Sequence, residues 1–315
     1  MRKSLPVLLA GALALSAAPA PAAAPAGNTA AGSFAKAANA FALDLYPKLA
    51  ADDPRANLFF SPYSIDTALL MAAAGAKGQT AAEFTATLHL AGDPDAAASA
   101  AALMKQLNPP AAGAAARPFS LTVANALWVD QHFPILPGYT AALQKSFGIA
   151  DAFPLDFAAA PEPARKTINT WIEDHTNKKI TDLIPAGALT PDTRVVLTNA
   201  IYFKASWQTP FEPTATKNEP FHAAGGKEVS APLMHVQHAF AYQDTGDLQI
   251  VSLPYTTSAR GNADLDMVIL LPKKADGLAA IEKELTAANL AKWTTPGQSQ
   301  ELNVYLPRFK TTSTL

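Results

Sequence analysis

The sequence predicts an α+β fold, with helices and mainly antiparallel β-sheets in one large domain. Apolar residues in the first hundred positions recur at helical spacing. After Ser120 the pattern changes to alternating apolar and polar residues, which is typical of strands. No tandem repeat and no linker divides the chain. These three observations favour a single mixed domain over separate helical and sheet domains.

Helices account for most of the N-terminal third. The predicted helices of the whole chain cover residues 34–50, 61–75, 80–90, 93–107, 139–147, 164–180 and 277–293. At the start of the third helix we expect a capping box, in which the Thr80 hydroxyl and the Glu83 carboxylate satisfy the first backbone N–H groups.

Strands dominate the rest of the chain. Their predicted ranges are 120–130, 195–207, 219–236, 239–255, 263–272 and 300–309. The run at 263–272 is almost continuously apolar, which indicates a strand covered on both faces.

An asparagine interrupts the apolar face of the strand at 195–207. Alternate side chains of a strand share a face, so Asn199 lies among Val195, Leu197, Ile201 and Phe203. A buried amide without partners costs about 1–3 kcal/mol. We therefore expect hydrogen-bond partners for Asn199 from another part of the chain.

The strand at 120–130 shows the same pattern. There Asn125 takes one position on a face formed by Leu121, Val123, Leu127 and Val129.

Composition restricts the class of protein and its partners. The chain has 315 residues, of which 49% are hydrophobic and 16% charged, as in a globular protein with a large core. The 24 basic and 26 acidic side chains give a net charge of −2 without any block of like charge. This balance gives no support for a nucleic-acid or anionic membrane surface, so we expect proteins or small molecules as partners.

The N-terminus has the features of a signal peptide. Arg2 and Lys3 precede an apolar run over residues 5–18, followed by small residues that offer Ala-x-Ala cleavage sites. We expect cleavage after Ala26, so that residues 1–26 are the signal peptide, residues 27–32 an Ala/Gly-rich leader and residues 33–315 the domain. The apolar run is too short for a membrane span, so we expect a secreted protein, extracellular or periplasmic.

No enzymatic constellation is visible. The absence of cysteine excludes a thiol nucleophile and thiolate metal sites. Of the six histidines, His235 and His238 are three apart in a strand pattern, which places them on opposite faces. His175 completes an apolar helix stripe, and we expect it to be hydrogen-bonded and half-buried. We predict no catalytic residue, no metal and no cofactor, and hence no enzyme.

Several stretches, taken together, resemble the serpin family. They are "NLFFSPYSIDTALLMAAAGAKGQTAAEF", "ANALWVD", "INTWIEDHTNKKITDLI", "VVLTNAIYFKASWQTPFEP" and "LDMVILLPKK", in that order along the chain. The resemblance runs from about Phe34 to the last residue. It implies three β-sheets with eight or nine helices, in which the helix around Trp171 crosses the large sheet A.

The resemblance also implies roles for four residues. Ser61 and Ser64 match the helix serines beneath the point where sheet A parts, and Asn199 matches the strand asparagine of this region, called the shutter. Trp207 matches the tryptophan where the loop first enters the sheet, called the breach. Two simpler interpretations stay open, since Ser61 can be only a helix cap and Trp207 an ordinary core aromatic.

The family resemblance implies a protease inhibitor. Serpins typically inhibit serine, sometimes cysteine, proteases by a suicide substrate-like mechanism, in which a cleaved reactive loop inserts into sheet A. The hypotheses are a bacterial-type exported inhibitor and, as an alternative, a non-inhibitory binding or storage serpin.

In the family, the segment matching "LPRFK" is followed by the loop, the fifth strand of sheet A and the shutter histidine. We therefore expect a truncated, incomplete chain without a reactive-site bond. Such a chain should be inactive as given and prone to polymerise, whereas the complete form should be a monomer.

Overall fold

The computed structural model describes residues 11–12, 30–54, 56–93, 95–107, 119–149, 152–223, 227–256 and 265–311. Within these residues, helices and sheets mix along the whole chain, which confirms the predicted α+β class. The described helices are α1 (Ala30–Asp52), α2 (Pro62–Ala73), α3 (Gly78–Thr87), α4 (Ala96–Leu107), α5 (Pro137–Phe147), α6 (Pro161–His175), α7 (Leu278–Lys283) and α8 (Ala287–Thr294), with short 3-10 turns at Leu90–Gly92 and Pro213–Ala215. None of these helices is long and apolar enough to cross a lipid bilayer.

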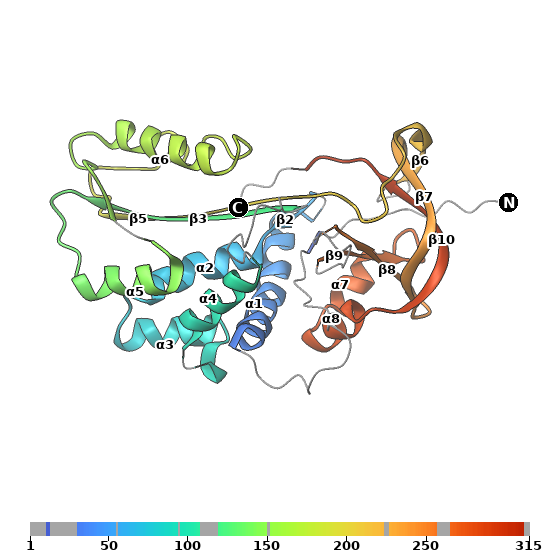
Figure 1. The fold of residues 1–315 in the computed structure, drawn as a ribbon, viewed down its shortest axis with the longest axis horizontal. Coiled ribbons are helices and arrows are strands. Elements are labelled where there is room, and N and C mark those ends of the chain that lie inside the picture. Colours follow the sequence, from blue (N-terminus) through green and yellow to red (C-terminus); the bar gives the residue numbers. More distant parts are fainter. Residues whose placement is uncertain are drawn as a thin grey trace, which may run out of the picture.

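A three-stranded sheet lies between two helical layers (Figure 1). Its order is β4 (Ala152–Leu155), β3 (Phe119–Asp130), β5 (Val195–Ala205), with β3 antiparallel to β5 and parallel to β4. Helix α6 covers one face, while α1, α2, α4 and α5 lie on the other.

The alternation of side chains explains why both faces of this sheet are covered. On the face toward α6, small residues such as Ala124, Ala126 and Ala200 are buried against Ile168 and Ile172 of the helix. The opposite face carries branched apolar side chains of both strands and joins the core of the N-terminal helices. The two asparagines expected on an apolar face belong to this second side.

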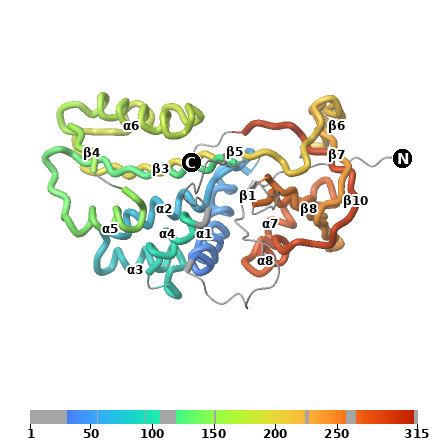
Figure 2. The backbone as a smooth tube through the Cα atoms, in the orientation of Figure 1, coloured from blue at the N-terminus to red at the C-terminus, as the bar shows by residue number. Residues whose placement is uncertain are grey.

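A second sheet has five strands and lies beside α7 and α8 (Figure 1). It consists of β6 (Lys217–His222), β7 (Glu228–Asp244), β8 (Leu248–Pro254), β9 (Asp266–Pro272) and β10 (Gln298–Pro307), all paired antiparallel. Strand β7 runs without a break through two of the predicted strand ranges, because β6 and β8 pair with its two ends and β10 with its centre. Figure 2 shows that the N-terminal helices and this C-terminal sheet occupy different ends of the molecule.

The third sheet has two strands, β1 (Gly11–Ala12) and β2 (Phe59–Phe60), which pair in parallel. Within the expected domain, residues 33–315, the described strands therefore form two sheets, and the third sheet that the resemblance implied stays a prediction. Strand β1 falls inside the expected signal peptide, so cleavage after Ala26 would remove it. The other residues of that segment lie outside the described part of the chain.

Three sequence-based expectations about helices were wrong. Helix α1 begins at Ala30, before the predicted start at residue 34. Helix α3 begins at Gly78, which places Thr80 inside the helix, and the side chain of Glu83 accepts a hydrogen bond from Gln79 instead of forming a capping box. The helix expected at 277–293 is two helices, because the Thr286 hydroxyl accepts from the Asn289 N–H and caps the second one.

The backbone at Gly297 lies very close to the backbone at Tyr242, and a substitution at Gly297 tests this contact. A Cβ atom at Gly297 would lie 2.1 Å from the carbonyl oxygen of Tyr242, whereas one at Gly138 would meet no atom within 4 Å. We expect Gly297→Ala to lower the free energy of unfolding by about 1–3 kcal/mol, since the backbones must separate. Gly138→Ala is the matched control, and we expect it to be neutral or to stabilise the protein by about 0.4–1 kcal/mol. Equal urea denaturation midpoints for both variants would contradict this packing.

Candidate functional site

The two serines named by the resemblance lie in the first turn of α2. Ser61 is the N-cap residue, and its hydroxyl oxygen accepts a hydrogen bond from the Ser64 N–H at 3.3 Å. Pro62 follows at the first helical position, where its missing N–H removes a donor that would have no partner in the helix. This arrangement fixes where α2 begins and directs the Ser64 side chain toward β5.

Asn199 belongs to a chain of hydrogen bonds that crosses four elements. The Ser64 hydroxyl donates to the Asn199 side-chain oxygen. The Asn199 amide nitrogen donates to the side-chain oxygen of Asn125 at 2.6 Å. The Asn125 amide nitrogen in turn donates to the carbonyl oxygen of Phe147 at 3.4 Å. We call Ser64, Asn199 and Asn125, with this carbonyl, the polar latch.

The latch satisfies groups that the apolar surroundings would otherwise leave without partners. Phe147 is the last residue of α5, so no N–H group of the helix donates to its carbonyl. Asn125 and Asn199 stand directly opposite each other in the antiparallel pair of β3 and β5. The latch therefore ties α2, β5, β3 and α5 together at one point.

The sequence contained a signal for Asn125 that the site prediction did not use. Asn125 and Asn199 each interrupt an apolar strand face, and two such residues in paired strands can satisfy each other. Only the register of β3 and β5 shows that they meet. Ser61, in contrast, has no direct hydrogen bond to Asn199 among the described residues. Its hydroxyl caps the first turn of α2, which carries Ser64.

Strand β5 ends the three-stranded sheet. It pairs along its whole length with β3, and in the described part of the chain no strand pairs with its other edge. The backbone groups on that edge are positioned to accept a further strand. The polar latch holds the strand at Asn199, near the middle of this edge.

Trp207 lies two residues beyond the end of β5 in a cluster of aromatic rings. It forms an isolated antiparallel bridge with Tyr255, and their rings stack at 4.5 Å. Phe211 meets the Trp207 ring edge-on at 6.0 Å, and Phe203 meets the Tyr255 ring at 5.3 Å. Burial raises the pKa of Tyr255 to about 12, so this phenol stays neutral at physiological pH. The cluster joins the end of β5 to the end of β8.

Helix α6 and the segment that follows it are fastened to each other above the sheet. The Asn169 side chain accepts from the Ile184 N–H and donates to the Ile184 carbonyl, both at 2.9 Å. Arg165 donates to the same carbonyl at 2.8 Å and pairs with Glu162. The segment between α6 and β5 therefore packs with the helix over the buried alanines of the sheet.

The histidines do not form a metal site in the described residues, where no group of three potential ligands occurs. His235 stacks on Tyr305 and contacts the Asn303 oxygen, while the His238 ring contacts Phe240. His175 is hydrogen-bonded to the Trp171 carbonyl, as expected, but the expectation that it is half-buried was wrong, because it is exposed on top of the Trp171 ring.

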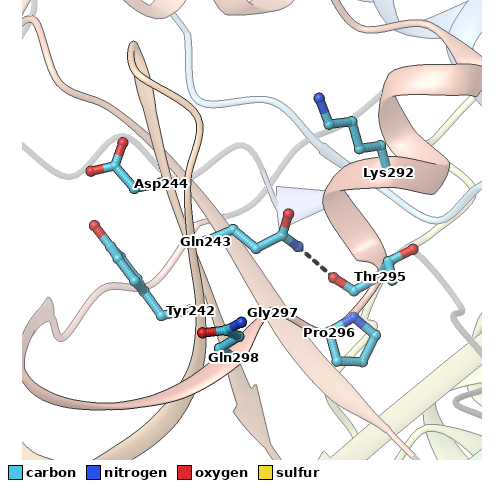
Figure 3. A pocket seen from close by; sticks show the side chains of 8 residues that line it. All are labelled: Tyr242, Gln243, Asp244, Lys292, Thr295, Pro296, Gly297 and Gln298. Atoms are coloured by element: carbon cyan, nitrogen blue, oxygen red, sulfur yellow. Dashed lines mark hydrogen bonds between the residues drawn. The ribbon is translucent and has the colours of Figure 1, made fainter.

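A shallow hollow of about 540 Å³ lies between the end of β7 and the end of α8 (Figure 3). Asp244 lies on one side, where it pairs with Lys273 at 2.6 Å, and Lys292 lies on the other. The Gln243 amide donates to the Thr295 carbonyl and crosses the space between them. No nucleophile and base stand together among its lining residues, so the hollow offers no catalytic arrangement.

The sequence pattern of the serpin family, described as serine protease inhibitors, matches residues 36–315. The chain therefore belongs to the serpin family, as the resemblance predicted.

Relatives support the same assignment. An uncharacterized serpin-like protein of Thermococcus kodakarensis is 38% identical over 275 residues, which are 87% of this chain and 61% of that protein. The leukocyte elastase inhibitor of Bos taurus is 38% identical over 278 residues, 86% of this chain and 71% of the inhibitor. The chain thus spans between three fifths and three quarters of these relatives.

Solved structures share the fold. Ovalbumin from emu (Dromaius novaehollandiae) superposes with a TM-score of 0.81 at 26% identity, covering 88% of this chain and 73% of ovalbumin. A cleaved form of serpin 42Da superposes with a TM-score of 0.80 at 33% identity, covering 89% of this chain and 73% of that protein.

The polar latch predicts a measurable coupling between α2 and β5. We expect Ser64→Ala and Asn199→Ala each to lower the free energy of unfolding by about 1–3 kcal/mol, because each leaves a partner unsatisfied. The double variant should lose less than the sum, with a coupling energy of about 0.5–3 kcal/mol by urea denaturation.

Ser230→Ala, at an exposed position of β7, is the matched control and should change stability by less than about 0.5 kcal/mol. Strict additivity of Ser64→Ala and Asn199→Ala would mean that the two side chains do not act together.

Proposed function

We propose that this protein is a serpin that inhibits serine-type endopeptidases. The observation that carries the proposal is the polar latch, which holds the middle of β5 to α2 and to β3. In the proposed mechanism a protease cleaves the reactive loop, the latch parts, and the cleaved loop enters the sheet as a new strand. The family assignment and the similarity to leukocyte elastase inhibitors support this mechanism.

Within this mechanism each predicted site residue has a specific task. Ser61 fixes the start of α2, and Ser64 and Asn199 form the shutter that must part before a strand enters. Trp207, stacked on Tyr255 at the end of β5, occupies the breach where insertion starts. The proposed mechanism uses strain release instead of catalysis, so the protein is not an enzyme and requires no metal or cofactor.

The proposed partner is a serine protease, with cysteine proteases as a further class. The net charge of −2, without a block of like charge in the sequence, gives no support for a nucleic acid or an anionic membrane as partner. We propose a monomer for the complete inhibitor and a tendency to polymerise when the edge of β5 is not protected, since unpaired strand edges attract other strands.

A non-inhibitory binding or storage protein is the second candidate. The fold similarity extends to emu ovalbumin, whose name refers to neither a protease nor inhibition. Inhibitory and non-inhibitory proteins should differ in their response to a protease. An inhibitory serpin forms a covalent complex with the protease, whereas a non-inhibitory one is either cleaved or left intact.

The decisive experiment incubates the full-length protein, expressed from its complete reading frame, with trypsin-like, elastase-like and subtilisin-like proteases. We expect a covalent band that survives boiling in detergent for at least one of them. The same protease with its active-site serine chemically blocked is the control and should give no band. Cleavage without any stable band across the panel would favour the second candidate.

We also propose that the protein is exported. The basic residues, apolar run and small residues of segment 1–26 support this location. Mass spectrometry of the protein recovered from the periplasm or medium should show an N-terminus at Gly27. Recovery of the uncleaved chain only from the cytoplasm would argue against export.

A further inference from the structure

A buried carboxylic acid lies on the helix that carries the latch serine. Asp66 is in the second turn of α2 and is only 1% exposed. Neither of its carboxyl oxygens has a hydrogen-bond partner in the described part of the chain. A buried charge without a partner strongly destabilises a fold, so the carboxyl is stable here only in its neutral form.

The elements around α2 supply no countercharge. Helix α2 contacts α1, α3, α4 and β5, yet burial is the only cause that raises the pKa of Asp66 from 3.8 to about 7. Two phenols contact α2 or belong to it: Tyr63 lies one turn before Asp66, and the hydroxyl of Tyr139 of α5 donates to the Met71 carbonyl. Burial raises the pKa of both phenols, and that of Tyr63 to about 12, so both stay neutral between pH 5 and pH 8.

Asp66 and Ser64 belong to different sides of one helix. Tyr63 and Asp66 are three residues apart and share a side of α2, and the Tyr63 ring packs edge-on against Phe34 of α1 at 6.3 Å. Ser64 points to Asn199 of β5. Helix α2 thus lies between the sheet and the N-terminal helices (Figure 1), and the way it packs on α1 determines where Ser64 meets β5.

We propose that Asp66 makes the polar latch sensitive to pH. Ionisation of the buried carboxyl expels α2 from its packed position, which separates Ser64 from Asn199 and frees β5. Between mildly acidic and mildly alkaline pH the latch therefore changes from closed to readily opened. The consequence for loop insertion rests on the proposed function, whereas the opening of the latch does not.

The direction and size of the effect follow from proton linkage. Opening exposes Asp66 to water, where its pKa returns toward 3.8, so the open state binds fewer protons than the closed state. The stability of the closed latch falls as pH rises from about 4 through about 7 and is constant above that. Between pH 6 and pH 8 the equilibrium constant for opening should rise about tenfold.

The test is hydrogen–deuterium exchange of the 315-residue chain at pH 6, 7 and 8, corrected for the intrinsic pH dependence of amide exchange. Peptides from α2 and β5 should lose protection by about tenfold over this range. Peptides from β8 and β9 are the internal reference and should not change. In Asp66→Asn the loss should disappear, while Asp52→Asn, at the exposed end of α1, should behave as the unaltered chain.

Three outcomes would overturn the proposal. The first is hydrogen-exchange protection of α2 and β5 that does not change with pH in the unaltered chain. Equal loss of protection in β8 and β9 would indicate global unfolding. Persistence of the pH dependence in both Asp66→Asn and Asp66→Ser would assign it to another group. None of these results depends on protease inhibition, so the two proposals fail separately.

Discussion

The need to satisfy two carboxamides inside an apolar layer organises the centre of this molecule. Asn199 and Asn125 face each other across β5 and β3, and each needs a donor and an acceptor that the neighbouring hydrophobes cannot supply. Ser64 on α2 and the last carbonyl of α5 complete the set. Because the partners come from four elements, the helices cannot move away from the sheet without leaving polar groups unsatisfied. The same bonds therefore hold the middle of β5 to α2 and to β3.

The other face of the sheet is built differently. Small side chains beneath α6 allow the helix to lie close to the strands, and Asn169 and Arg165 fasten the following segment to it. Apolar packing of this kind has no direction, whereas the latch is a small number of directed bonds. Asp66 adds a group whose neutral form is compatible with the core and whose charged form is not. A sheet held in this way can be stable and still respond to a local change.

Sequence patterns identified most of the fold and part of the site. The α+β class and the strand at Asn199 followed from periodicity, and the placement of Ser64 near that strand followed from the family motifs. Identifying Asn125 as a partner of Asn199 required the register of β3 and β5. The two residues are 74 positions apart, and no local sequence pattern contains that register. The start of α3 and the break before α8 depended on which of several capping residues is used. Asp66 was missed because aspartate is almost never fully buried, so its place on an apolar helix face gave no expectation of burial.

The central claim is that Asn199 is hydrogen-bonded on both sides within the closed sheet. Nuclear magnetic resonance of a sample labelled with ¹⁵N-asparagine measures the exchange of each side-chain amide with water directly. We expect slow exchange for the side-chain N–H groups of Asn199 and Asn125, and fast exchange for Asn303, which is exposed on β10. Exchange of Asn199 as fast as that of Asn303 would contradict the latch and the mechanism built on it.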